Sequence, residues 1–390
     1  MQLKATLRCN HFLRGILMKI KRGLTAFFAL AVAALISISG CSYEPVPYLC
    51  DVYSDYFPIG TCCKKSIIES YGDILNHFNS ITPEYEMKWG IMEPGEKGEY
   101  NYAEADNIVN WARQNNRIVR GHALIWYQNV PSWFEEEATD KERVLELIDE
   151  RIENTMTHFG DDVIYCWDVV NEALVDDPSE EQLASGEFYR SSENDPDRFG
   201  DGHSTIRYDF YGMCGRDYIW RSFSTADRVC REYGYDDMQL FYNDWFMHIP
   251  AKRDACVQMV KDMQADGVRI DGIGMQGHYW LNDYQEDKAA FIKNFEDAIK
   301  AYTGLGLDVH LTEIEVIVGK SLFGKESEQA ELYGKIFDIC RKYSTPWREG
   351  AGAVTSVTLW GAVDTSGSKN FIFKSNHRPK KAYYEITDFI

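Results

Sequence analysis

The sequence predicts a single α/β domain with the architecture of a (β/α)8 TIM barrel. Eight short, strand-like runs recur along the chain, at residues 57–60, 79–82, 117–122, 164–171, 238–243, 272–276, 309–313 and 356–360. Helical patterns separate these runs, and strands that alternate with helices form parallel sheets. No GxGxxG or P-loop pattern follows any of the runs, which disfavours the competing fold, a doubly wound open sheet that binds a nucleotide.

Two of the intervening helices have clear boundaries. Thr139 and Glu142 have the spacing of a capping box, and Gly160 is placed to end the helix that this box opens. The apolar face of this helix repeats at spacings of four or seven residues, at Val144, Ile148, Ile152 and Phe159. A second helix has the same type of face before Gly304, at Phe291, Phe295, Ile299 and Tyr302. Both patterns predict helices that pack on the outside of the barrel.

The longest connection between two runs lies between the fourth and the fifth. It contains residues 176–210, which are polar and rich in Ser, Asp, Glu and Gly. We interpret this segment as an inserted loop on the rim formed by the carboxyl ends of the strands, where such barrels build their sites. An insertion without function is the alternative.

The first forty residues differ from the rest of the chain. They contain six basic residues and no acidic one, followed by an apolar run at 24–38 that is short for a membrane span and typical of a signal peptide. Ser39 and Gly40 precede Cys41, a pattern that resembles a bacterial lipobox and predicts lipidation of Cys41. An ordinary secretory signal with a chance cysteine is the alternative. Met18 begins a better-formed signal than Met1.

These features predict a signal peptide at 1–40, a tether at 41–55 and a catalytic barrel at 56–390. The protein would then be an exported lipoprotein of the outer membrane or cell surface, which contacts the membrane only through Cys41. We expect a monomer.

The charge of the chain excludes one class of partner. Acidic residues number 61 and basic residues 41, for a net charge of −20. Nucleic-acid binding requires clustered Lys and Arg, so we exclude nucleic acid as a partner. Aromatic residues make up 14% of the chain, more than a core needs by itself.

The cysteines predict neither a zinc site nor a disulfide framework. Ten are present, and eight remain when Cys9 and Cys41 are left out. No CxxC pair occurs among those eight, so zinc ligation is not expected. One or two disulfides are compatible with export, and we expect mostly buried thiols. We expect no metal and no cofactor.

Polar and aromatic residues gather where the predicted strands end. They are Glu84 and Lys88, His122 and Trp126, Asn171 and Glu172, Asn243 and Asp244, Gln276 and His278, Glu313 and Glu315, and Trp360. The carboxyl ends of barrel strands meet at one pole, and the interior of a barrel is filled by apolar layers. Packing alone therefore does not explain this set, and we predict an active site.

Two carboxylates carry the predicted chemistry. Glu172 directly follows a strand and has Asn171 beside it to bind a hydroxyl, which suits a proton donor. Glu313 ends the seventh run. A proton donor and a nucleophile in different environments are what cleavage of a glycosidic bond requires. Metal ligation with His122 and His278 is the open alternative.

The chain resembles the family-10 glycoside hydrolases, the retaining endo-β-1,4-xylanases, over about residues 55–388. The matching stretches occur in the family's order, at residues 79–89, 119–126, 167–172, 240–245, 271–278, 311–315, 358–361 and 379–383.

The resemblance implies a role for each residue of the site. Glu172 would be the acid/base and Glu313 the nucleophile, with their carboxyl groups about 5–5.5 Å apart. His278 would orient Glu313, Gln276 would contact Glu172, and Asn171 would hold the 2-hydroxyl of the sugar under attack. A further set would bind sugars on the non-reducing side of the cut: Glu84, Lys88, His122, Trp126 and Trp360.

Four departures from the family pattern concern the substrate rather than the reaction. Tyr85 stands where the family has Asn, at the place where the second sugar would be bound. Tyr127 and Asn129 replace the usual His and Gln. Glu315 replaces the usual Asp in support of the catalytic histidine, and the second Trp expected shortly after Trp-Gly is absent from residues 364–368.

The sequence therefore predicts an endo-β-1,4-xylanase that hydrolyses xylan or xylo-oligosaccharides with retention. One rival is a same-family hydrolase of another β-linked substrate, such as decorated arabinoxylan, a β-xyloside or a saponin glycan. The other rival is a xylan-binding lipoprotein without activity.

Overall fold

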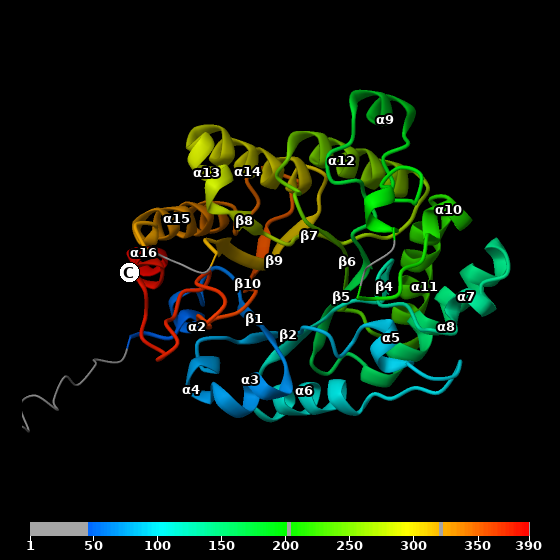
Figure 1. The fold of residues 1–390 in the computed structure, drawn as a ribbon, viewed down its shortest axis with the longest axis horizontal. Helices are drawn as coiled ribbons and strands as arrows, with labels where there is room; N and C mark the ends of the chain where they lie inside the picture. The colour runs from blue at the N-terminus through cyan, green and yellow to red at the C-terminus, as the bar shows by residue number, and fades with distance from the viewer. Residues whose placement is uncertain (1–45, 201–203, 320–322, 390) are drawn as a thin grey trace, which may run out of the picture. The chain divides into compact units, whose positions relative to one another are not determined.

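Eight parallel strands form a closed ring in the computed structural model, which describes residues 46–200, 204–319 and 323–389 (Figure 1). Going round the ring, the strands are β1 (Ile59–Cys63), β2 (Ser80–Pro83), β3 (Ile118–Gly121), β5 (Ile164–Asn171), β6 (Gln239–Asp244), β7 (Gly272–Met275), β9 (Asp308–Ile317) and β10 (Val354–Leu359). The pairing of β10 with both β9 and β1 closes the ring. Each predicted run overlaps one of these strands, so the predicted (β/α)8 barrel is confirmed.

Two short strands extend the ring at its carboxyl end. They are β4 (Ile125–Trp126), which pairs with β5, and β8 (His278–Trp280), which pairs with β9. Both carry residues of the predicted site, Trp126 and His278. The extra pairing fixes their backbones to the neighbouring strands.

Helices surround the ring (Figure 1). They are α2 (Leu49–Val52), α3 (Lys65–Ser70), α4 (Gly72–Leu75), α5 (Trp89–Met92), α6 (Ala103–Gln114), α7 (Phe134–Glu137), α8 (Lys141–Phe159), α9 (Glu180–Ser185), η1 (Pro196–Arg198), α10 (Phe210–Cys214), α11 (Asp217–Tyr233), α12 (Pro250–Ala265), α13 (Leu281–Glu286), α14 (Lys288–Thr303), α15 (Glu326–Lys342) and α16 (Lys381–Thr387). The predicted apolar faces of α8 and α14 are buried.

The start of α8 differs from the prediction. The N-cap is Asp140, whose side chain accepts a hydrogen bond from the amide of Arg143 at 3.0 Å. Thr139 and Glu142 therefore do not form the predicted capping box, because the adjacent Asp140 is a better N-cap than threonine and occupies the position. Gly160 ends the helix as predicted, with φ of 65°.

Strand β1 lies further along the chain than predicted. The prediction ended it at Gly60, whereas the strand continues to Cys63, which pairs with Pro83 of β2. Gly60 lies inside the strand because neighbouring strands approach it closely: a Cβ there would lie 2.5 Å from Oγ1 of Thr358. This glycine thus marks a close approach of β10 rather than the end of a strand.

The segment 176–210 follows the carboxyl end of β5 and has structure of its own. It contains α9, which opens with a complete capping box between Ser179 and Gln182, and η1. Asp176 anchors it through ion pairs with Arg190 at 2.6 Å, Arg198 at 2.6 Å and Lys252 of α12 at 3.1 Å.

The later part of the predicted tether, residues 48–55, contacts the barrel. The described residues from Tyr48 onward form one compact unit, and Leu49 and Tyr53 are fully buried. The backbone amide of Cys50 donates to the carbonyl of His77 at 3.0 Å, so residues 48–55 pack on the barrel. The predicted signal peptide and Cys41 lie outside the described residues. Within 46–200, 204–319 and 323–389, no helix is both long and apolar enough to cross a membrane.

The cysteines of the described residues are all free thiols. Six are buried, and Cys50 and Cys62 are partly exposed, which confirms the prediction of mostly buried thiols. No group of three or more His, Cys, Asp or Glu side chains in the described part of the chain is arranged to hold a metal ion.

Candidate active site

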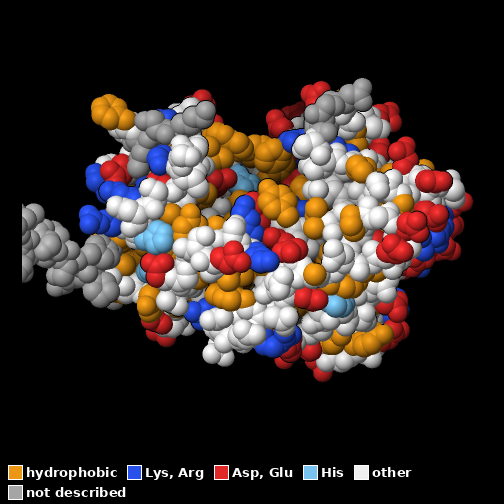
Figure 2. Space-filling model, turned by 60° about the horizontal axis from the view of Figure 1, so that its bottom comes forward, with side chains coloured by type: hydrophobic (Ala, Val, Ile, Leu, Met, Phe, Trp, Pro, Cys, Tyr) orange, Lys and Arg blue, Asp and Glu red, His pale blue; other side chains and the backbone are white. Residues whose placement is uncertain are grey.

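The backbone places the two predicted catalytic carboxylates at the same end of the barrel. Glu172 follows the last residue of β5, and its amide donates to the carbonyl of Asn243 on β6 at 2.9 Å. Glu313 lies within β9, and its amide donates to the carbonyl of Gln276, just after β7, at 2.7 Å. Hydrogen bonds between neighbouring strands therefore hold both residues in position. Figure 2 shows one face of the molecule hollowed, with hydrophobic, acidic and histidine side chains exposed in the hollow.

Glu313 is buried and surrounded by hydrogen-bond donors. Asn243 Nδ2 donates to Oε1 at 3.0 Å, and His278 Nε2 lies 3.1 Å from Oε2. Burial by itself would raise the pKa of Glu313, but the hydrogen bond from His278 and the charges of His122 and His278 outweigh it and hold the pKa below its usual value. The carboxylate is therefore ionised and available as a nucleophile.

His278 is fixed between two carboxylates. Its Nδ1 lies 2.9 Å from Oε1 of Glu315, and Oε2 of Glu315 accepts from Asn370 Nδ2 at 2.7 Å. Burial lowers the pKa of His278, but the hydrogen bonds to Glu313 and Glu315 prevail and raise it to about 10. The ring is thus an imidazolium at neutral pH and donates from both nitrogens. Glu315, although longer than the Asp of the family pattern, still contacts His278.

The raised pKa of His278 predicts a pH dependence of stability. A histidine has a pKa near 6.5 when unfolded, so the contribution of His278 is fully present below that pH and is lost as the pH rises through about 10. We expect the difference in Tm between the wild type and His278→Gln to narrow from about pH 6 to 10. Thermal unfolding followed by circular dichroism measures it.

His158→Gln is the matched control for this prediction, because His158 pairs with Asp106 at the surface. Its Tm difference from the wild type shows how much of the pH dependence arises from the loss of any ion-paired histidine, and the remainder belongs to His278. A difference for His278→Gln that widens with rising pH would contradict the charged imidazolium.

Glu172 has neutral donors around its carboxylate, in contrast to Glu313. Trp126 Nε1 donates to Oε2 at 3.1 Å, and Oε1 accepts from Gln276 Nε2 at 3.0 Å and from Asn171 Nδ2 at 3.2 Å. The backbone of Glu172 has φ of 56°, a left-handed conformation that costs a non-glycine residue about 1–3 kcal/mol. Arg190 Nε donates to its carbonyl at 3.0 Å and helps to hold this conformation.

Lys88 and Tyr85 lie on the side of the cleft predicted to bind the non-reducing sugars. The Lys88 ammonium lies 4.5 Å from the ring centroid of Tyr85 and 4.6 Å from that of Trp126. Burial lowers the pKa of Lys88, and nearby carboxylates, including Glu84, partly offset this. Glu84 pairs with Lys64 at 3.4 Å. Tyr85, which replaces the family's Asn, is 47% exposed and presents its phenol ring to solvent.

His122 contacts Asp168, which forms a buried ion pair with Arg120 inside the barrel. Nδ1 of His122 lies 2.9 Å from Oδ2 of Asp168, which also accepts from Arg120. Burial would raise the pKa of Asp168, but the Arg120 charge outweighs it and lowers the pKa. The His122 ring meets that of Trp360 edge-on, with centroids 5.8 Å apart, so the two predicted sugar-binding residues are in contact.

Asp168 was missed as a site residue, and Asn243 was predicted at the site from its place at a strand end but was given no role. Asn243 contacts Glu313 and also donates to Asn171 Oδ1 at 2.8 Å. Asp168 supports His122, and nothing in the sequence showed that these two side chains would meet.

A (β/α)8 barrel with two differently surrounded carboxylates at its strand ends, flanked by indoles and amide groups that can bind hydroxyls, defines a glycoside hydrolase. The pattern of Glycosyl hydrolase family 10 matches residues 49–389. The chain belongs to this family, as its motifs predicted.

Several known β-1,4-xylanases are similar to this chain. The chain is 35% identical to a β-1,4-xylanase of Dictyoglomus thermophilum, covering 88% of this chain and 91% of that one. It is 33% identical to endo-1,4-β-xylanase A of Caldicellulosiruptor saccharolyticus, covering 87% and 95%. Other relatives are longer: the chain covers 31% of endo-1,4-β-xylanase A of Thermotoga maritima.

The fold is also similar to solved structures. An endo-1,4-β-xylanase from Caldicellulosiruptor owensensis has a TM-score of 0.73 at 28% identity, covering 88% of this chain and all of that one. A psychrophilic family-10 endo-β-1,4-xylanase has a TM-score of 0.71 at 30% identity, covering 87% of this chain and all of that one.

Proposed function

We propose that this chain is an endo-β-1,4-xylanase, which hydrolyses internal linkages of xylan with retention of configuration. The observation that carries the proposal is the contrast between the two carboxylates. Glu313 is buried and paired with an imidazolium, whereas Glu172 accepts from the neutral donors of Trp126 and Gln276. These environments suit a nucleophile held by a charged donor and an acid/base held by neutral donors.

The reaction would proceed in two displacements. In the first, Glu313 attacks the anomeric carbon while Glu172 gives its proton to the leaving oxygen, so the glycosidic bond breaks and a glycosyl ester of Glu313 forms. In the second, Glu172 takes a proton from water, which attacks the anomeric carbon and frees Glu313. Asn171 would hold the 2-hydroxyl of the sugar in both steps. Two inversions give net retention.

The substrate assignment rests on the side chains around the carboxylates and on the relatives. Glu84, Lys88 and His122 offer polar groups for hydroxyls, and Trp126 and Trp360 offer indole faces for the C–H faces of sugars. The relatives are named as xylanases, which supports xylan rather than another β-linked polymer.

Xylohexaose hydrolysis followed by proton NMR tests the proposal. We expect internal cleavage, with xylobiose and longer fragments as first products, and the β-anomer released first. An α-anomer formed first would contradict retention, and release of single xylose units from one end would contradict the endo mode. Faster hydrolysis of cellohexaose would favour the rival substrate class. Tight binding without release of reducing ends would favour a non-catalytic binding protein.

We propose in addition that the protein is an exported, monomeric lipoprotein anchored through Cys41. Support comes from the basic and apolar segment 1–40 and from the small residues before Cys41. Labelled palmitate incorporated by the wild type and equally by Cys41→Ala would contradict the anchor.

A further inference from the structure

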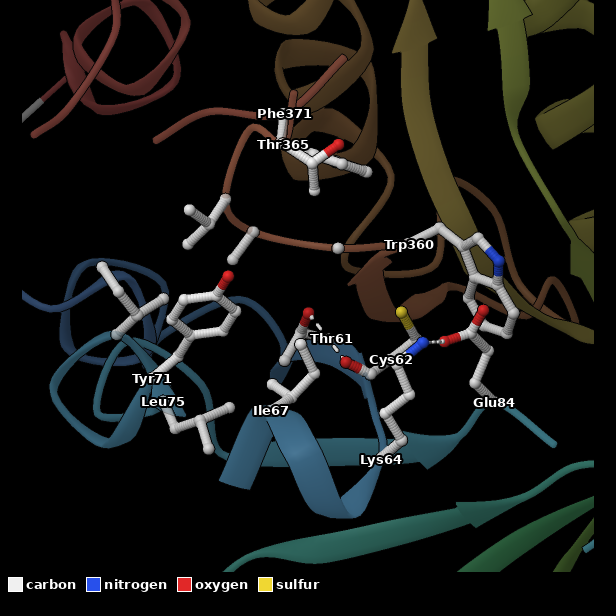
Figure 3. Close-up of a pocket in the computed structure, with 14 residues that line it drawn as sticks. Thr61, Cys62, Lys64, Ile67, Tyr71, Leu75, Glu84, Trp360, Thr365 and Phe371 are labelled. Carbon is white, nitrogen blue, oxygen red and sulfur yellow. Dashed lines mark hydrogen bonds and ion pairs between the residues drawn. The ribbon is translucent and has the colours of Figure 1, made fainter. Parts of the chain in front are cut away.

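A cavity of about 320 Å³ lies beside the predicted sugar-binding residues, between the end of β1, the helices α3 and α4, and the segment that follows β10. Figure 3 shows how it is arranged. Glu84 and Trp360 lie at one end, next to the cleft. Tyr71 and Leu75 lie at the other end, away from the catalytic carboxylates. A group attached to a sugar held by Glu84 and Trp360 would therefore be able to enter the cavity directly.

The walls of the cavity are mainly apolar. Ile67 and Leu75 face Phe371 across the space, and Tyr71 contributes a further ring (Figure 3). Such a lining, with few polar groups, is typical of sites for small organic groups, which begin at about 300 Å³. The cavity therefore suits a flat, apolar group rather than another hydrated sugar.

Two hydroxyls of the lining, those of Thr61 and Thr365, already have partners. The hydroxyl of Thr61 donates to the carbonyl of Cys62 at 3.4 Å. Oγ1 of Thr365 accepts from the amides of Gly367 at 3.2 Å and Ser368 at 3.1 Å. These bonds leave few groups to replace the water around a polar substituent, and unpaired buried hydroxyls are costly.

The charges of the lining disfavour an acidic substituent. Lys64 is the one cation among the described residues of the lining, and it pairs with Glu84 at 3.4 Å. A uronate would have to displace Glu84 or lie against it, and like charges repel. An acetyl group carries no charge but would leave most of the space empty.

The wall of the cavity that contains Thr365 coincides with a departure from the family pattern. The second Trp expected in residues 364–368 is absent, and the exposed Thr365 lies at the cavity instead. A large indole there would occupy space beside Phe371. The smaller residue leaves room for a ring supplied by the ligand.

We propose that this cavity receives an aromatic acyl group esterified to a side-chain sugar of the xylan. The inference rests on the proposed function, because the xylan backbone must lie in the cleft for its substituent to reach the cavity. The acyl ring would pack between Ile67, Tyr71 and Phe371, and its ester would lie near Glu84 and Trp360.

The test compares two substrates that differ only in the acyl group. They are an arabinoxylo-oligosaccharide esterified with ferulic acid and the same compound after alkaline removal of the ester. We expect the wild type to have a kcat/KM about tenfold higher for the esterified form, the lower end of the range for discrimination by an apolar pocket. Ile67→Trp, which fills the cavity, should abolish this preference while leaving the hydrolysis of unsubstituted xylohexaose unchanged.

Ile68→Trp is the matched control, because Ile68 is the next residue on α3 and packs on the same core but does not line the cavity. It should retain the preference.

If Ile67→Trp has a lowered Tm, Phe371→Ala, which removes one wall, should also reduce the preference. A wild type without preference for the ester, or a preference that survives Ile67→Trp, would overturn the inference while xylohexaose is still cleaved. A wild type that does not cleave xylohexaose would overturn the proposed function, and the inference with it.

Discussion

Glu313→Ala is expected to lose hydrolysis of xylohexaose almost completely, with kcat reduced about 10⁵-fold or more, as for removal of other enzyme nucleophiles. The reason is geometric and electrostatic. Glu313, which lies within β9, is held by Asn243 and His278, and no other described carboxylate has the same pair of donors. Without it, no ester can form, and the first displacement has no nucleophile. Release of reducing ends, measured at saturating substrate, checks this.

Glu296→Gln is the control, because it removes an ionised carboxylate that lies outside the cleft. Hydrogen bonds from Lys342 and Tyr343 lower the pKa of Glu296 to about 2, so it is also firmly ionised, but it lies on α14 outside the cleft and its variant should turn over normally. Azide added to Glu313→Ala should enter the vacated space and give a glycosyl azide of inverted configuration. Turnover of Glu313→Ala near that of the wild type would refute the assigned nucleophile.

The strands that were predicted correctly are those whose own residues form a nearly continuous apolar run. Residues 164–171 are buried over nearly their whole length, so the predicted and observed bounds of β5 coincide. The positions of Glu172 and Glu313 followed from the same logic, because parallel strands in a closed ring end at one pole. Boundaries that depend on partners far along the chain, such as Gly60 against Thr358, were missed.

The interior of the barrel differs most from the expectation of apolar layers. Arg120 crosses it, contacting Asp168 and lying 2.6 Å from Nδ1 of His310, whose Nε2 lies 3.0 Å from Oγ1 of Thr355. All but Thr355 are buried. Single polar residues inside apolar runs give no sign in sequence that they will meet, since their partners lie on separate strands. The support that Asp168 gives to His122 was for this reason visible only in the structure.

Glu172→Ala is expected to slow the two displacements to different extents. The first displacement needs Glu172 only when the leaving group requires a proton, and the second needs it only when the attacking nucleophile must lose one. On xylohexaose the leaving oxygen needs a proton, so kcat should fall about 10²- to 10⁴-fold, the usual contribution of a general acid or base. On 2,4-dinitrophenyl β-xylobioside the leaving group needs no proton, so the ester of Glu313 should still form rapidly and then accumulate, giving a burst of dinitrophenol.

Azide, which needs no general base, should speed the second step and give a product of retained configuration. Glu172 Oε1 also contacts Asn171 and Gln276, so Glu172 could act only by holding these two side chains in place. Such a structural role would reduce the turnover of both substrates equally. An equal loss on the two substrates, without a burst, would exclude Glu172 as the acid/base.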